Sequence, residues 1–177
     1  DVHIEDCKVH DNADLGIHSG SGSQRAIARR NTITGNQYGY FFCWGVKFSL
    51  VEDNTIDKNE QGISIGHRDT DNWIRNNRIT SSGKVGIIFR PERGQGYSAD
   101  RNRVEGNEIT NSGGEDGIAV DVQGYTADCE IRKNTMQETR SPAKRIGIRL
   151  GEHTRNIDTS ENTIEGFAVE IEDKSAT

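Results

Sequence analysis

The sequence has few of the residues that mark several common fold classes. Of its 177 residues, 2 are proline, 3 are cysteine and 3 are leucine, and no apolar run is long enough to span a membrane. The cysteines are odd in number and lack a CxxC spacing, so they indicate neither a disulfide framework nor a zinc site. Leucine this scarce excludes a leucine-rich repeat, and the apolar runs are too short for a helical solenoid.

Basic charge is also scarce. The formal net charge is -6 and the pI is about 5.4. A general nucleic-acid binder usually presents a basic face, and nothing in the sequence suggests one, so we expect neither a nucleic-acid partner nor a membrane. The chain opens with DVHIEDCKV rather than with a basic and then apolar leader, so either no signal peptide existed or it was removed.

What the sequence does contain is a repeat. The pattern N-x-I-x-x-N, followed after a few residues by G-I-x-I, occurs in seven copies, with a period near 23 residues in the first copies. Its leading position is occupied by Cys7, Asn31, Asn54, Asn77, Asn107, Asn134 and Asn162. We expect these asparagines to form an inward ladder in which each amide bonds the backbone and the next asparagine, rather than to bind a ligand.

Each copy holds three short runs in which apolar and polar residues alternate. Alternation with a period of two is typical of strands that bury one face. Three such strands per copy predict an all-β solenoid, a parallel β-helix of about seven coils, with residues 1–177 as a single domain. A mean hydropathy of only -0.80 fits this fold, because a narrow solenoid core needs few inward residues per coil.

The N-x-I-x-x-N-x-x-G-I repeat resembles the right-handed parallel β-helix repeats of the pectin-lyase-like superfamily, over essentially the whole chain. The resemblance implies the right-handed coil, which the general preference for right-handed crossovers supports. That superfamily holds lyases, hydrolases, epimerases, adhesins and tailspikes, so it implies the fold and leaves the function open. It points to a polysaccharide partner and to an extracellular, cell-surface or periplasmic location.

Residues that the repeat does not require gather on one predicted face. Counted from the column glycine of each copy, the positions two and four residues along face outward, because side chains alternate along a strand. Together with the turn that follows, they form one outer patch of His18, Phe41, Cys43, Trp44, His67, Arg68, Asp69, Arg90, Glu92 and Asp121. In the superfamily that this chain resembles, such a strand commonly forms the floor of a saccharide cleft.

The segment GHRDTDN, residues 66–72, lies at the centre of this patch. Taken alone it reads as a solvated turn, because Asp, Asn, Gly and Thr favour turns and Arg68 and Asp69 could pair on the surface. Its position between Trp44 on one coil and Arg90 and Glu92 on the next favours a site. Trp44 and Phe41 could stack on sugar rings or could equally cover the apolar flank of a loop. An insertion follows at 89–102, and loops on a rigid scaffold often carry function.

Three functions fit these residues. Elimination or epimerisation at a uronic acid needs a base, for which His67 is the candidate, and cations on the sugar carboxylate, for which Arg68 and Arg90 are candidates. Glycoside hydrolysis needs two carboxylates, and Asp69, Glu92 and Asp121 lie on successive coils. The third possibility is a glycan-binding or structural rod, or an adhesin, without chemistry.

The candidate site residues fall into three groups. The catalytic candidates are His67, Asp69, Arg90, Glu92 and Asp121, and the substrate-binding candidates are His18, Phe41, Trp44 and Arg68. Calcium is the one candidate cofactor, because carboxylates suit this hard cation, and Asp69, Asp71 and Asp121 are its candidate ligands.

The motifs of the known enzymes of the superfamily are absent. The sequence lacks the Asp-Pro-His run of alginate epimerases, the paired-Asp and Gly-His-Gly motifs of polygalacturonases and the arginine motifs of pectate lyases.

The ends of the repeat carry no evident cap. No capping helix precedes Val2, and only EDKSAT follows the last repeat. Uncapped strands invite edge pairing, so we expect a piece of a longer protein or ends that another subunit or a missing domain covers.

Overall fold

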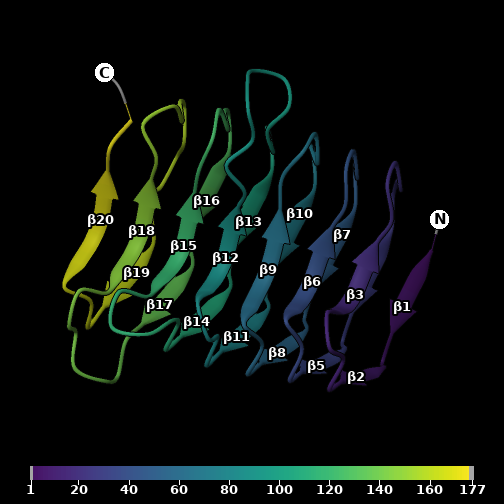
Figure 1. Ribbon diagram of the computed structural model, residues 1–177, viewed down its shortest axis with the longest axis horizontal. Helices are drawn as coiled ribbons and strands as arrows, with labels where there is room; N and C mark the ends of the chain where they lie inside the picture. The colour runs from purple at the N-terminus through teal and green to yellow at the C-terminus, as the bar shows by residue number, and fades with distance from the viewer. Residues whose placement is uncertain (1, 176–177) are drawn as a thin grey trace.

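The computed structural model describes residues 2–175. The chain winds around one axis, and each of the first six coils adds one strand to each of three parallel sheets, while the seventh adds a strand to two of them (Figure 1). The predicted all-β solenoid of about seven coils is therefore confirmed. None of the described residues forms a helix that is long and apolar enough to cross a membrane.

Each sheet is a stack of equivalent strands from successive coils. The first sheet contains β1 (His3–Glu5), β4 (Ile27–Arg29), β7 (Leu50–Glu52), β10 (Trp73–Arg75), β13 (Arg103–Glu105) and β16 (Glu130–Arg132). The second contains β2 (Lys8–His10), β5 (Thr32–Thr34), β8 (Thr55–Asp57), β11 (Arg78–Thr80), β14 (Glu108–Thr110), β17 (Thr135–Gln137) and β19 (Thr163–Glu165). The third contains β3 (Leu15–Ser19), β6 (Tyr38–Phe42), β9 (Gln61–Ile65), β12 (Val85–Phe89), β15 (Ile118–Val122), β18 (Ile146–Leu150) and β20 (Val169–Asp173).

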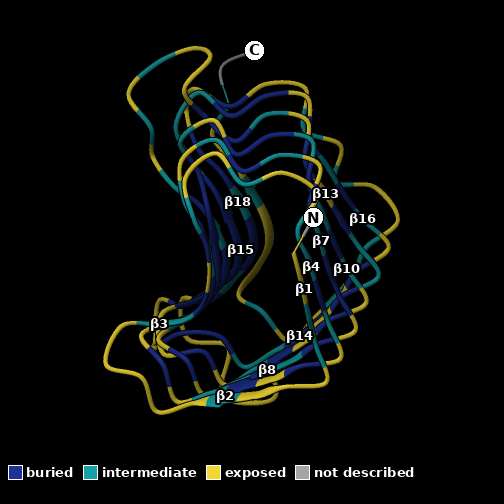
Figure 2. Cartoon of the chain, turned by 90° about the vertical axis from the view of Figure 1, so that its right-hand side faces the viewer, coloured by how far each residue is buried: buried dark blue, intermediate teal, exposed yellow. Residues whose placement is uncertain are grey.

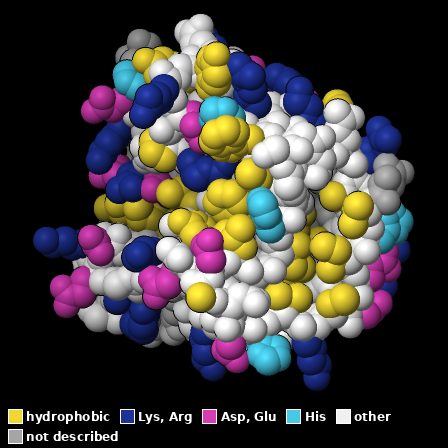
Figure 3. Space-filling view, turned by 45° about the vertical axis from the view of Figure 1, so that its right-hand side comes forward, with side chains coloured by type: hydrophobic (Ala, Val, Ile, Leu, Met, Phe, Trp, Pro, Cys, Tyr) yellow, Lys and Arg dark blue, Asp and Glu magenta, His cyan; other side chains and the backbone are white. Residues whose placement is uncertain are grey.

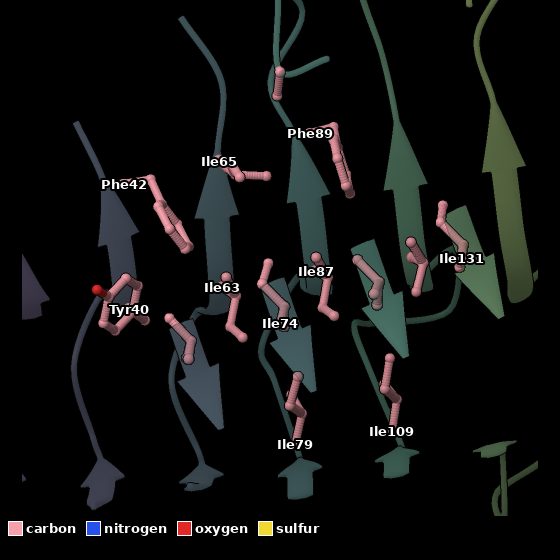
Figure 4. Close-up of a cluster of buried hydrophobic side chains, with 14 of the residues drawn as sticks. Tyr40, Phe42, Ile63, Ile65, Ile74, Ile79, Ile87, Phe89, Ile109 and Ile131 are labelled. Atoms are coloured by element: carbon pink, nitrogen blue, oxygen red, sulfur yellow. The ribbon is translucent and has the colours of Figure 1, made fainter. Parts of the chain in front are cut away.

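The core lies between the three sheets, and the buried residues follow their strands (Figure 2). Phe42, Ile65 and Phe89 form one row along the third sheet, and Ile63 and Ile87 belong to the row beside it (Figure 4). Each of these side chains is fully buried by its own coil and the coils on either side. Stacking buries the same position repeatedly, which explains how so polar a chain sustains a core.

The asparagine ladder is confirmed. Asn54 Nδ2 donates to Asn77 Oδ1 at 2.9 Å, and Asn77 Nδ2 donates to Asn107 Oδ1 at 3.0 Å, while each oxygen also accepts the backbone N–H of the preceding asparagine. A further ladder that the repeat did not reveal joins Asn72 to Asn102 at the corner between the third and first sheets. These buried amides satisfy turn backbone groups that would otherwise be unpaired.

The predicted position of Asp121 needs a correction. Counting from Gly117 placed it four residues along its coil, but the strand register pairs Ile88 with Asp121, two positions along, and Asp121 with Arg149. Gly117 belongs to a tight loop instead, where an added Cβ would lie 2.0 Å from the Ser112 carbonyl oxygen. The alignment therefore slipped by two residues, because this glycine serves the loop and not the strand.

Candidate functional site

The segment that opens the candidate site is a tight turn after β9. Asp69 N donates to Gly66 O at 2.7 Å, and the two central residues, His67 and Arg68, have φ of +25° and +65°. A turn with positive φ at both central residues usually takes Asn-Gly, because most side chains disfavour this backbone region. His67 and Arg68 are therefore held in place at some cost in conformational energy.

Asp69 anchors this turn from inside. Its side chain is fully buried and accepts the backbone N–H groups of Val46 at 2.9 Å and Gly66 at 3.0 Å. Burial raises the pKa of Asp69 to about 6, although these hydrogen bonds and Arg90 act in the opposite direction. The position that was predicted to be catalytic thus lies beneath the surface, where its carboxylate fixes the turn backbone.

Arg90 reaches back over two preceding coils. Its guanidinium donates to Ser64 Oγ and Phe42 O, each at 3.1 Å, and to Asp69 Oδ2 at 3.3 Å. Its Cζ lies 4.6 Å from the centroid of the Phe41 ring. Through these contacts the Arg90 guanidinium links the turn to the strands of the two preceding coils.

Glu92 contacts both Arg90 and the turn. Its Oε1 accepts His67 N at 3.0 Å and lies 3.7 Å from Arg90 Nε, and its Oε2 lies 3.3 Å from His67 Nδ1. An added Cβ at Gly66 would lie 2.8 Å from both Arg90 Nε and Glu92 Oε1, so only glycine leaves room for this packing. A carboxylate beside Nδ1 favours the imidazole tautomer in which Nδ1 donates and Nε2 keeps a lone pair.

Aromatic rings hold the imidazole on its other sides. The Trp44 ring stacks on His67 with centroids 4.5 Å apart and planes at 25°, and Tyr97 meets His67 edge-on at 5.9 Å. The Arg68 Cζ lies 4.1 Å from the Tyr97 centroid. Successive coils thus present a continuous row of rings at one corner of the β-helix, where hydrophobic, basic and histidine side chains are interspersed on the surface (Figure 3).

These rings open onto a groove, which we call the His67 groove. It has a volume of about 620 Å³ and is lined by Trp44, His67, Glu92, Arg93, Gly94, Gln95 and Tyr97. Five of these residues come from the 90–97 loop, which stands out between β12 and β13 in Figure 1. Sequence reasoning marked this insertion as an unusual loop but assigned no role to Arg93, Gln95 or Tyr97, because an insertion has no repeat column that fixes its place.

The other predicted residues lie outside this groove. His18 and Phe41 occupy the outer row of the third sheet, with ring centroids 5.8 Å apart. Asp121 is buried and receives two hydrogen bonds from Arg149, at 3.0 and 2.6 Å. Asp71 is paired in the same way with Arg101, at 2.8 and 3.0 Å.

The proposed calcium ligands are therefore not brought together. Asp69, Asp71 and Asp121 each contact a different arginine. Within residues 2–175, no group of three or more His, Cys, Asp or Glu side chains could hold a metal ion.

Two family models match the chain. The model for the right-handed β-helix region matches residues 49–177, and that for NosD, described as a periplasmic copper-binding protein, matches residues 1–95. The described residues do not fit a copper centre, because they contain no suitable cluster and because Met136, the one methionine, is fully buried in the core. No protein with a curated description matches the chain at a significant level.

Several solved structures share the fold. A double mutant of the periplasmic alginate epimerase AlgG is similar with a TM-score of 0.68 and 16% identity, over 99% of this chain and 45% of that one. The Dettilon tailspike protein is similar with a TM-score of 0.59 and 16% identity, over 92% of this chain and 40% of that one. The chain thus spans less than half the length of these proteins, and at this identity the likeness concerns the fold.

Proposed function

The chain belongs to the right-handed β-helix and NosD families, and we propose that it binds an acidic polysaccharide in the His67 groove and cleaves it by elimination. The observation that carries this proposal is the placement of His67. Its Nδ1 is next to the Glu92 carboxylate, its ring stacks on Trp44 and meets Tyr97 edge-on, and it lines an open groove. A base that is oriented in this way needs little rearrangement before it reacts.

The charge of the groove suits an acidic sugar. The protein as a whole carries -6 and would repel a polyanion, yet Arg93 lines the groove and Arg68 lies at its edge on Tyr97. Both arginines are exposed, unlike Arg90, and guanidinium groups pair well with carboxylates. We therefore assign the role of binding a uronate carboxylate to Arg68 and Arg93 instead of Arg90.

The chemistry follows from these positions. His67 Nε2 takes the proton at C5 of the uronate, and the electron pair that is left moves toward the carboxylate, whose charge the arginines stabilise. The C4–O bond then breaks to give a C4–C5 double bond, and the departing oxygen takes a proton from the Tyr97 hydroxyl or from water. Epimerisation would instead need a donor that returns a proton to the opposite face of C5; because we assign the Tyr97 hydroxyl to the departing oxygen, we favour elimination.

Hydrolysis receives less support from the same geometry. It needs two carboxyl groups about 5–10 Å apart on either side of the scissile bond. Glu92 is the one carboxylate among the described residues that line the His67 groove. Asp69 is buried beneath the turn and Asp121 is paired with Arg149, so neither is placed to act with Glu92.

The similar proteins give indirect support. AlgG is named as an alginate epimerase, and alginate is a polymer of uronic acids, so one protein of this fold has a substrate of the proposed class. The names of AlgG and of the NosD family both refer to the periplasm, which favours a location outside the cytoplasmic membrane for this chain.

A second candidate function is glycan binding without chemistry. Trp44 is 60% exposed although its ring stacks on His67, so it offers a flat apolar face to the solvent. Such a face is suited to the apolar side of a sugar ring whether or not a reaction follows. The two candidates differ in what His67 must do.

The test compares turnover with binding. The protein is incubated with polygalacturonate, alginate and a neutral glucan, with and without Ca²⁺, while the ultraviolet absorbance of unsaturated sugars and the product masses are followed. We expect unsaturated products from an acidic polymer. His67→Phe, which keeps a ring in the stack, should lose about 100-fold or more in turnover and keep its affinity.

The binding arm has a matched control. Trp44→Ala should lower affinity by about tenfold. Phe48→Ala should not, although Phe48 lies in the same coil and is 57% exposed, because it lines no part of the groove. Binding without products would favour the second candidate, and an absence of both binding and products would refute the proposal.

A further inference from the structure

A second hollow lies on the other side of the 90–97 loop. It has a volume of about 450 Å³ and is lined by Pro91, Glu92, Gln123, Gly124, Arg149, Gly151, Glu152, His153 and Lys174. We call it the His153 hollow. Glu92 lines both this hollow and the His67 groove, so the two sites meet at one side chain.

The His153 hollow has a ring platform of its own. The rings of Tyr125 and His153 are almost parallel, at 10°, with centroids 4.7 Å apart. Backbone bonds hold both ends of this stack, from Tyr125 N to Ser98 Oγ at 3.1 Å and from Thr154 N to Gly151 O at 3.1 Å. His153 is exposed, so the stack ends in a flat face toward the solvent, as the Trp44 and His67 stack does.

The two sites differ in charge. In the His153 hollow, both cations already have carboxylate partners, since Arg149 is bonded to Asp121 and Lys174 Nζ lies 3.0 Å from Glu172. Glu92 and Glu152 add two more carboxylates at the wall. A sugar carboxylate would meet net negative charge here, whereas carboxylate oxygens readily accept hydrogen bonds from uncharged sugar hydroxyls.

We propose that the His153 hollow binds an uncharged sugar of the same saccharide chain whose acidic sugar occupies the His67 groove. This inference rests on the proposed function and narrows its substrate class. The preferred ligand is a polysaccharide in which acidic and uncharged sugars are linked to each other, rather than a polymer of uronic acid alone.

The test uses three series of oligosaccharides of equal length in titration calorimetry with the His67→Phe background, which should bind without turnover. Oligogalacturonates are acidic throughout, hyaluronan oligosaccharides alternate glucuronate with uncharged N-acetylglucosamine, and chitin oligosaccharides are uncharged throughout. We expect the alternating series to bind about tenfold more tightly than the all-acidic series, because only its uncharged sugar can use the second platform. The uncharged series should bind most weakly, since it leaves the arginines of the His67 groove unpaired.

Variants test whether the preference for the alternating series depends on the Tyr125 and His153 rings. His153→Ala and Tyr125→Ala should each reduce the affinity of the alternating series to that of the all-acidic series and leave the all-acidic affinity unchanged. Phe48→Ala should change neither, and a thermal melt checks that each variant is folded. His153 is exposed at a turn, so its replacement leaves the core intact.

The outcomes separate the two proposals. Equal affinities for both acidic series, or an equal loss for both in His153→Ala, would overturn the second platform and leave the proposed function standing. If neither acidic series binds, the proposed function fails, and this inference fails with it.

Discussion

Two turns at the same corner of the β-helix, Gly20–Ser23 and Gly66–Asp69, differ in almost every side chain. Both follow a strand of the third sheet, and in both the N–H of the fourth residue donates to the carbonyl of the first, at 3.1 Å and 2.7 Å. The first turn uses Ser-Gly at its centre, with positive φ at Gly22, which glycine accepts without strain.

The second turn carries side chains in that strained backbone region. His67 and Arg68 both have positive φ, and the residue at the fourth position is a buried aspartate instead of a half-exposed serine. The positive φ of the third residue recurs at this corner in the first two coils, but there Gly22 and Gly45 occupy the position. The third coil places an arginine where the other two use glycine, and a side chain that is kept at a strained position points to function.

Replacing the fourth residue of each turn should give the largest difference in unfolding free energy between the two turns. Asp69→Ala would leave the N–H groups of Val46 and Gly66 and the Arg90 guanidinium without their buried acceptor, so we expect a loss of about 3–5 kcal/mol in unfolding free energy. Ser23→Ala should lose less than about 0.5 kcal/mol, as an ordinary surface change. Urea denaturation at neutral pH measures both, and similar losses at the two positions would contradict the buried-anchor role of Asp69.

The same aspartate should make stability depend on pH. Burial raises its pKa from 3.8 to about 6, so between these values the unfolded chain has released the proton while the folded chain keeps it. Stability contributed by the protonated carboxyl is therefore lost as pH rises through this window, by about 2–3 kcal/mol. Asp69→Asn should flatten that part of the profile, and a variant that kept the full slope would assign it to other groups.

The fold could be predicted because stacking demands the same residue in every coil. Ile33, Ile56 and Ile79 recur since each packs on the next, and the asparagines recur since each amide bonds its neighbour. Such columns are visible in one sequence without any structure. The further ladder, through Asn72 and Asn102, was missed because an insertion separates its two members.

The site could be predicted only in part, for a related reason. The turn at 66–69 and Trp44 follow the repeat, so counting along the coils predicted that they are neighbours. Arg93 and Tyr97 come from the 90–97 loop, whose path no repeat fixes, and the inward course of the Arg90 side chain depends on Ser64 and Asp69 together. The two-residue error in the predicted position of Asp121 also comes from a loop, because Gly117 belongs to the loop before the strand and was mistaken for the glycine of the repeat.

The smallest difference that we expect between the two turns is the conformational energy of the positive φ at Arg68, which occupies the position of Gly22 in the first coil. Arg68→Gly and Arg68→Ala both remove the cation from the groove and the contact with Tyr97, but only glycine relieves the positive φ. We therefore expect Arg68→Gly to be more stable than Arg68→Ala by about 1 kcal/mol, and both to bind an acidic oligosaccharide more weakly than the parent chain. Thermal melts and titration with oligogalacturonate measure the two effects separately. Equal stability of the two variants would mean that the turn relaxes without strain. An unchanged affinity would show that Arg68 does not contribute to binding in the groove. If Arg68→Gly is more stable than Arg68→Ala and both bind more weakly than the parent chain, this corner keeps a strained residue because that residue binds the ligand.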